Sequence, residues 1–77
     1  MVVYVLYSDS IGRRYIGHTS DLEKRIKEHN AGRVKSTKAG VPWRIIAYKR
    51  YSSRSDTRWM ERSLKRSRKK LHEFLGL

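Results

Sequence analysis

The sequence has no cysteine, a single proline and only seven acidic residues, which stand against 19 lysines and arginines among 77 residues. Without cysteine the fold cannot depend on disulfides. No apolar run approaches the roughly 20 residues of a membrane-spanning helix, and no cleavable leader is present, so we expect a soluble protein of the reducing cytoplasm. A chain of this length predicts one domain, residues 1–77, with a small core and modest stability.

The formal net charge of +12 is large for such a small surface. A polyanion is the natural partner for this charge, and nucleic acid is favoured. An anionic membrane would need a basic helix with a broad exposed apolar face, whereas the helices expected here need their apolar faces for the core. The alternative interpretation is that the charge only keeps the protein in solution.

A hairpin is predicted at the start of the chain. Val2–Tyr7 is apolar almost throughout, which favours a strand covered on both faces. Ser8–Gly12 contains the aspartate, serine and glycine of an ordinary hairpin loop, and the second strand includes Arg14–Gly17. Tyr4 and Tyr15 then lie on paired strands.

A helix is expected to follow, because Ser20 and Glu23 form the pattern of a capping box and Asn30–Gly32 supplies a stop. At 100° per residue, Arg25 and His29 share the apolar sector with Leu22 and Ile26, so they point toward the sheet, and Glu28 points outward. The simpler alternatives are that the Arg25 side chain extends past the edge of the apolar face into solvent, and that His29 interacts with the last backbone carbonyls of its helix.

Residues 33–42 combine basic and hydroxyl side chains without periodicity, which indicates a loop. Arg33, Lys35 and Lys38 suit contacts with phosphates that position a nucleic acid without reading its sequence. A flexible and merely solvated loop is the alternative. Lys65, further along the chain, is a fourth candidate for nucleic-acid binding.

Trp43–Tyr51 is rich in aromatic and β-branched residues and predicts a third strand, with Ile46 and Tyr48 on one face and Trp43, Ile45 and Ala47 on the other. Ser53 begins a second capping pattern, and helical spacing continues to the C-terminus with a break near Ser67. The predicted fold class is therefore α/β, a three-stranded antiparallel sheet flanked by helices.

Glu61 is the carboxylate without an obvious structural role. The other six acids fall in a hairpin loop, in first helical turns, on an outward helix face or in the C-terminal tail. Glu61 lies at the margin of the buried sector of its helix. By spacing alone, an ion pair with Lys65 four residues later is the simpler interpretation.

Five blocks of this sequence, in order, resemble the GIY-YIG nuclease superfamily, in particular small stand-alone members similar to the N-terminal nuclease domain of an excinuclease. The blocks are Val3-Tyr4-Val5-Leu6, Tyr15-Ile16-Gly17-His18-Thr19, Leu22 to Asn30, Ser36-Thr37-Lys38 with Pro42-Trp43, and Glu61 with Leu64-Lys65. The first motif reads Val2-Val3-Tyr4 and lacks the family's glycine, and no asparagine follows Asn30.

The resemblance implies the same α/β fold and assigns roles at a catalytic site. Tyr15, helped by Tyr4, would activate or orient the attacking water, and Arg25 would hold the scissile phosphate, with His29 joining them. Glu61 matches the family's metal-binding glutamate. With one spare carboxylate, a single Mg²⁺ or Mn²⁺ ion held by Glu61, waters and substrate phosphate is the economical site.

The leading functional hypothesis is therefore a metal-dependent endonuclease that hydrolyses phosphodiester bonds in DNA, a class linked to DNA repair. A nucleic-acid-binding module on the same fold, catalytically weak or silent, is the alternative, and a basic protein bound to structural RNA is a third class. DNA is the expected partner, with RNA also open, and the sequence leaves the oligomeric state undetermined.

Overall fold

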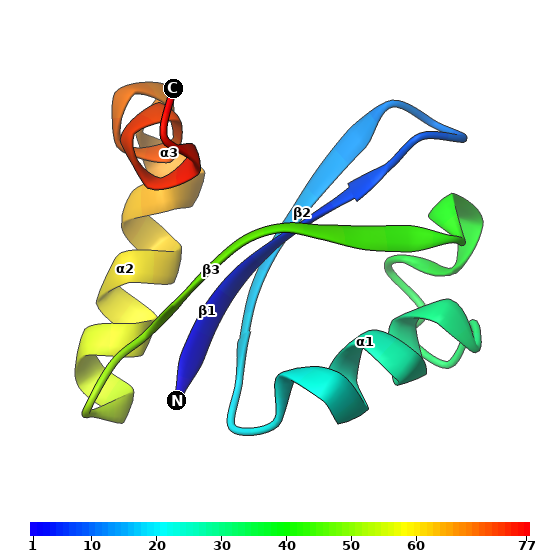
Figure 1. Ribbon diagram of the computed structural model, residues 1–77, viewed down its shortest axis with the longest axis horizontal. Helices are drawn as coiled ribbons and strands as arrows, with labels where there is room; N and C mark the ends of the chain where they lie inside the picture. The colour runs from blue at the N-terminus through cyan, green and yellow to red at the C-terminus, as the bar shows by residue number, and fades with distance from the viewer.

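A computed structural model describes residues 1–77 and contains one antiparallel sheet. Its strands are β1 (Val2–Ser8), β2 (Arg13–Thr19) and β3 (Trp43–Arg50), arranged in the order β2-β1-β3. Figure 1 shows helix α1 (Leu22–Asn30) on one side of this sheet and helices α2 (Arg54–Arg66) and α3 (Arg68–Leu75) on the other. The predicted α/β class and the three-stranded antiparallel sheet are confirmed.

The central strand β1 builds a core on each face of the sheet. Val3 and Val5 pack with Leu64 of α2 on one face, and Tyr4 and Leu6 pack toward α1 on the other. All four β1 side chains are at most 1% exposed. The apolar run thus forms a strand that is covered on both faces, as predicted.

Helix α1 begins one residue later than the capping-box pattern predicts. The N-cap is Asp21, whose Oδ1 accepts the backbone N–H of Lys24 at 3.1 Å. Ser20 is exposed and precedes the cap. Either residue offers an acceptor of the type that N-caps require, so the pattern located the start but not the capping side chain. The helix ends at Asn30, and Gly32 adopts a positive φ of 71°.

The predicted faces of β3 are wrong for two residues, because the pairing with β1 contains an irregularity. Val5 pairs with Ala47 and Leu6 with Ile45, which leaves Ile46 as an extra residue between them. An extra residue reverses the alternation of everything beyond it. Ala47 therefore joins Ile46 in the core beneath α2 and α3, and Tyr48, paired with Tyr4, faces the α1 side.

The segment between α1 and β3 is a loop, as predicted, but it is not fully solvated. It contains a 3₁₀ turn, η1 (Lys38–Gly40), and Thr37 is 1% exposed. The Trp43 indole donates from Nε1 to the Thr37 carbonyl at 2.7 Å, and Ser8 donates to the Gly40 carbonyl at 2.6 Å. These bonds hold the loop against the end of the hairpin.

The break near Ser67 is confirmed. Ser67 ends α2 and also caps α3, since its Oγ accepts the backbone N–H of Lys70 at 3.2 Å. Ser53 caps α2 in the same way through the N–H of Asp56. None of the helices has the length and apolar character needed to cross a membrane.

Candidate active site

An open cavity of about 650 Å³ lies over the edge strand β2. Its lining comes from β1, β2, the β2–α1 turn, α1 and α2, and we refer to it as the Glu61 cavity. Four of the five residues predicted as catalytic line it, namely Tyr4, Tyr15, Arg25 and Glu61. These residues come from four different elements and are brought together only by the fold.

The two tyrosines lie side by side because the residue opposite Tyr4 is a glycine. Tyr4 pairs with Gly17 across β1 and β2. A Cβ atom on Gly17 would lie 2.6 Å from the Tyr4 hydroxyl and 3.1 Å from the Tyr15 ring. Only glycine leaves room for both rings, whose centroids are 6.4 Å apart. The glycine of the Tyr-Ile-Gly motif therefore shapes the floor of the cavity.

The fifth predicted residue, His29, does not line the cavity but lies behind Tyr4. It is fully buried, with Nε2 3.0 Å from the Tyr4 hydroxyl and Nδ1 2.7 Å from Oγ1 of Thr37. Burial, together with the charge of Arg25, lowers the pKa of His29, which keeps the imidazole neutral near pH 7. This histidine contacts buried side chains rather than the terminal carbonyls of its helix.

Arg25 reaches the cavity from α1, and its Nη1 lies 3.4 Å from Oε1 of Glu28. Glu28, which is about one third exposed, also lines the cavity. Burial raises the pKa of Tyr4, while the Arg25 guanidinium acts in the opposite direction. The cation thus lies where it can stabilise negative charge on a phenol or on a phosphate.

Glu61 reaches the cavity from α2, and its carboxylate accepts hydrogen bonds from two side chains. Oε1 accepts from Nδ1 of His18, and Oε2 accepts from Nζ of Lys65 at 2.9 Å. Burial would raise the pKa of Glu61, but these two hydrogen bonds outweigh it and the pKa is lowered. The carboxylate is therefore ionised, and the Lys65 pair expected from spacing coexists with the position at the cavity.

Sequence reasoning missed two residues of this arrangement. His18 follows Gly17 in the motif block, and strand alternation places its side chain on the α2 side of β2, which is a signal that could have linked it to Glu61. Thr37 offered no signal, because its contact with His29 depends on how the loop folds back.

The donors around the cavity set limits on a metal ion. No group of three or more histidine, aspartate or glutamate side chains is close enough to hold one, although Asp21 and Glu28 also line the cavity. Mg²⁺ commonly keeps several waters and binds through one or two carboxylates together with substrate phosphate. One ionised carboxylate at an open cavity fits that mode and does not fit a closed protein cage.

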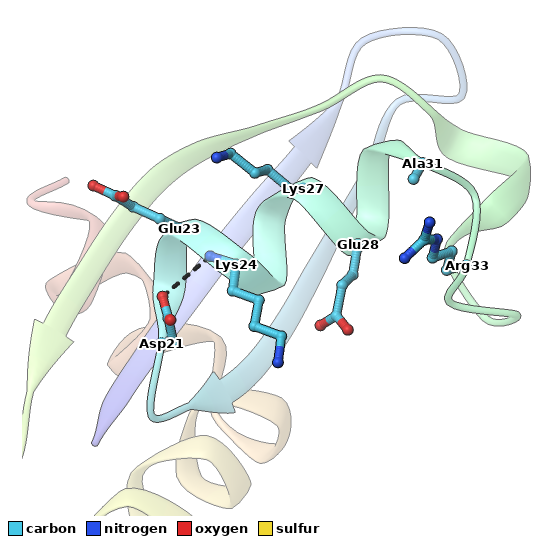
Figure 2. A pocket seen from close by; sticks show the side chains of 7 residues that line it. All are labelled: Asp21, Glu23, Lys24, Lys27, Glu28, Ala31 and Arg33. Carbon is cyan, nitrogen blue, oxygen red and sulfur yellow. Dashed lines mark hydrogen bonds between the residues drawn. The ribbon is translucent and has the colours of Figure 1, made fainter.

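The predicted loop cations lie away from the cavity. Arg33, Lys35 and Lys38 do not line it. Figure 2 shows Arg33 at the far end of a shallow pocket on α1, where the carboxylates of Asp21, Glu23 and Glu28 are interspersed with lysines. Lys65 differs from the loop cations, because it contacts Glu61 directly.

Comparison with known proteins identifies the family. The GIY-YIG catalytic domain family matches residues 1–73. A UPF0213 protein of Streptococcus pneumoniae is 35% identical over 84% of this chain and 68% of its own length. A UPF0213 protein of Listeria welshimeri is 38% identical over 79% of this chain and 70% of its own length. One from Halalkalibacterium halodurans is 32% identical over 97% of this chain and 81% of its own length. No solved structure matches the chain. The chain belongs to the GIY-YIG family.

Proposed function

We propose that this protein is an endonuclease that hydrolyses phosphodiester bonds in DNA and depends on one Mg²⁺ or Mn²⁺ ion. The observation that carries the proposal is the convergence of Tyr4, Tyr15, Arg25 and Glu61 on one open cavity. Phosphodiester hydrolysis needs an oriented water, a positive group at the developing charge on phosphorus and a place for a divalent cation. The cavity offers a side chain suited to each requirement.

Each side chain would act according to its surroundings. Tyr15 would orient the attacking water, because a phenol is a weak base at neutral pH. Arg25 would hold the scissile phosphate, since a guanidinium can donate two hydrogen bonds to phosphate oxygens. His29 would fix the Tyr4 hydroxyl from behind and, being neutral, could exchange a proton with it.

Glu61 would hold the metal ion together with waters and a phosphate of the substrate. The ion, when bound, would supply positive charge at the reacting phosphate. His18 and Lys65 would keep the Glu61 carboxylate ionised and aimed at the cavity, in the way that outer partners orient metal ligands.

The test is incubation with labelled duplex, single-stranded and branched DNA in the presence of Mg²⁺ or Mn²⁺, using wild type, Glu61→Ala and Glu73→Ala. Glu73 is an exposed acid on α3 outside the cavity, so it is a matched control for the loss of one charge. Cleavage by wild type and Glu73→Ala, and none by Glu61→Ala, supports the proposal. Equal cleavage by all three contradicts it.

A catalytically silent DNA-binding module is the second candidate, and one observation favours it. Both oxygens of Glu61 already have protein partners, so the carboxylate has a structural role without any metal. This candidate predicts tight DNA binding and no cleavage of any substrate in the panel with either ion.

A further inference from the structure

A second basic surface begins where the Glu61 cavity ends and crosses α2. His18 and Glu61, which line the cavity, also line a second hollow together with Arg58, Arg62 and Arg66. Arg66 and Lys65 in turn line a third hollow, which runs to the β1–β2 hairpin. The three hollows are therefore continuous.

Six arginines line the second and third hollows, and together we call this surface the arginine groove: Arg13, Arg14, Arg58, Arg62, Arg66 and Arg68. All six are exposed. The protein has four side-chain ion pairs, and none of them involves any of these arginines. Glu61 is the sole carboxylate that lines either hollow, and it faces the cavity end. The groove therefore has a strong and uncompensated positive field.

The pocket on α1 provides the contrast. Three carboxylates line it beside three cations, so its charges largely cancel (Figure 2). The excess positive charge of the protein is thus not spread evenly over its hollows. It is concentrated in the second and third hollows, which extend away from Glu61 over α2 and the β1–β2 hairpin.

The spacing of the arginines suits a nucleic-acid backbone. From Arg58 to Arg66 the helix rises about 12 Å. Duplex DNA presents about one phosphate per 1.7 Å of its axis, counting both strands, so several phosphates fall within that length. Guanidinium groups match phosphate oxygens with paired hydrogen bonds, and close unpaired guanidiniums repel one another until an anion binds.

The groove lacks the features of a single-strand site. Proteins that hold unpaired bases combine a basic groove with exposed aromatic rings on which the bases stack. Tyr7 is the aromatic residue in the groove lining, and it is half-buried with the Arg44 guanidinium 5.4 Å from the centre of its ring. The exposed Trp59 does not line the groove and lies under Lys70 instead. A backbone rather than free bases is the matching ligand.

We propose that the arginine groove binds the phosphate backbone of duplex DNA on one flank of the phosphodiester bond held in the Glu61 cavity. The inference rests on the proposed function for the position of that bond. It assigns the flank to α2 and the hairpin, on the opposite face of the sheet from the loop of Arg33, Lys35 and Lys38.

The test compares two triple variants that lose the same charge. Arg14→Gln/Arg62→Gln/Arg66→Gln removes groove residues, and Lys27→Gln/Arg50→Gln/Lys69→Gln removes three exposed cations outside the groove. Binding to a labelled duplex is followed by fluorescence anisotropy in EDTA over a salt series. The groove variant should reduce the magnitude of the slope of log K against log salt concentration by about 2.7 units, because each lost phosphate contact removes about 0.9. The control variant should reduce that magnitude by less than one unit.

Equal losses in the two triple variants, or wild-type binding by the groove variant, would overturn the inference. Duplex RNA and vesicles of anionic lipid are run beside the DNA. A loss by the groove variant that is larger for either of these than for DNA would overturn the assignment to DNA. Thermal melting of both variants shows that each is folded. Because no metal is present, failure of the nuclease proposal would appear only in the cleavage assay and would leave this result unaffected.

Discussion

The hydroxyl of Tyr4 lies 3.0 Å from Nε2 of His29, while Nδ1 of the same ring lies 2.7 Å from Oγ1 of Thr37. A neutral imidazole has one donor and one acceptor nitrogen, so it donates one of these bonds and accepts the other. The sheet, α1 and the loop before β3 are therefore joined through one buried ring directly behind the Glu61 cavity.

Acid should destabilise the protein through His29. Its folded pKa lies below the ordinary value of 6.5, so the neutral form is the one that the fold favours. The stabilisation is complete above pH 6.5 and is lost as the pH falls toward the folded pKa, because the unfolded chain takes up the proton first. Melting temperature measured from pH 8 to pH 5 should fall for wild type and change less for His29→Gln. Glu61, whose pKa is lowered from 4.5, titrates below this range. Parallel curves for the two proteins would contradict the prediction.

Tyr15→Phe and Arg25→Ala should lower the single-turnover cleavage rate by about 10² to 10³, the usual loss when one positioned donor is removed. Both should retain the fold. Tyr48→Phe and Arg50→Ala are the controls, since both residues are exposed on β3 and neither lines the cavity. Rates and melting temperatures are measured on the same samples. If Arg25→Ala unfolds the protein and the folded fraction cuts normally, Arg25 has a structural role only.

Glu61→Gln should abolish metal-dependent cleavage and leave DNA affinity unchanged or slightly raised, because it removes negative charge beside a basic groove. If Glu61 served only as an ion-pair partner of Lys65, Glu61→Gln would keep normal turnover and lose a few tenths of a kcal/mol in stability. Titration with Mn²⁺ should broaden the NMR signals of Tyr15 and Arg25 in wild type. Equal broadening in Glu61→Gln would exclude Glu61 as the ligand.

Gly17→Ala should disrupt the cavity, since the new methyl group would lie 2.6 Å from the Tyr4 hydroxyl. We expect loss of cleavage and a stability loss of about 1–3 kcal/mol from overpacking. Gly76→Ala is the control, because its Cβ would meet no atom within 4 Å. Gly76 has a φ of 78°, so its alanine variant should lose about 1–2 kcal/mol of stability and no activity. An active Gly17→Ala would show that the tyrosines need not occupy these positions.

DNA binding should depend steeply on salt, with a log-log slope near −5 for about six phosphate contacts. Lys35→Ala and Lys38→Ala, in the loop before β3, should each reduce the magnitude of that slope by about one unit, with little change in sequence preference. Anisotropy titrations at several salt concentrations measure the slopes. A flat salt response of the wild type would contradict the expectation that nucleic acid is the partner.

Local patterns in the sequence determined most of the fold. The run Val2–Tyr7 forms the buried central strand, Ser53 caps α2, and Ser67 separates α2 from α3, as short-range hydrogen bonding and hydrophobic spacing dictate. The same patterns failed at two points. Asp21 caps α1 in place of Ser20, because either side chain could accept the same kind of backbone hydrogen bond. An extra residue at Ile46 in the pairing with β1 reverses the expected faces of Ala47 and Tyr48, and strict strand alternation does not predict it.

For the site, the sequence supplied the residue types and the order of the motifs, but only the tertiary structure decided which side chains meet. Glu61 binds His18 across 43 residues of chain, and His29 binds Tyr4 across 25. Spacing along one helix or strand carries no information about such pairs, because their distance depends on how α1 and α2 pack on opposite faces of the sheet. The arginine groove has the same origin: α2 and the β1–β2 hairpin each bring unpaired cations, and only their packing makes one continuous surface of them.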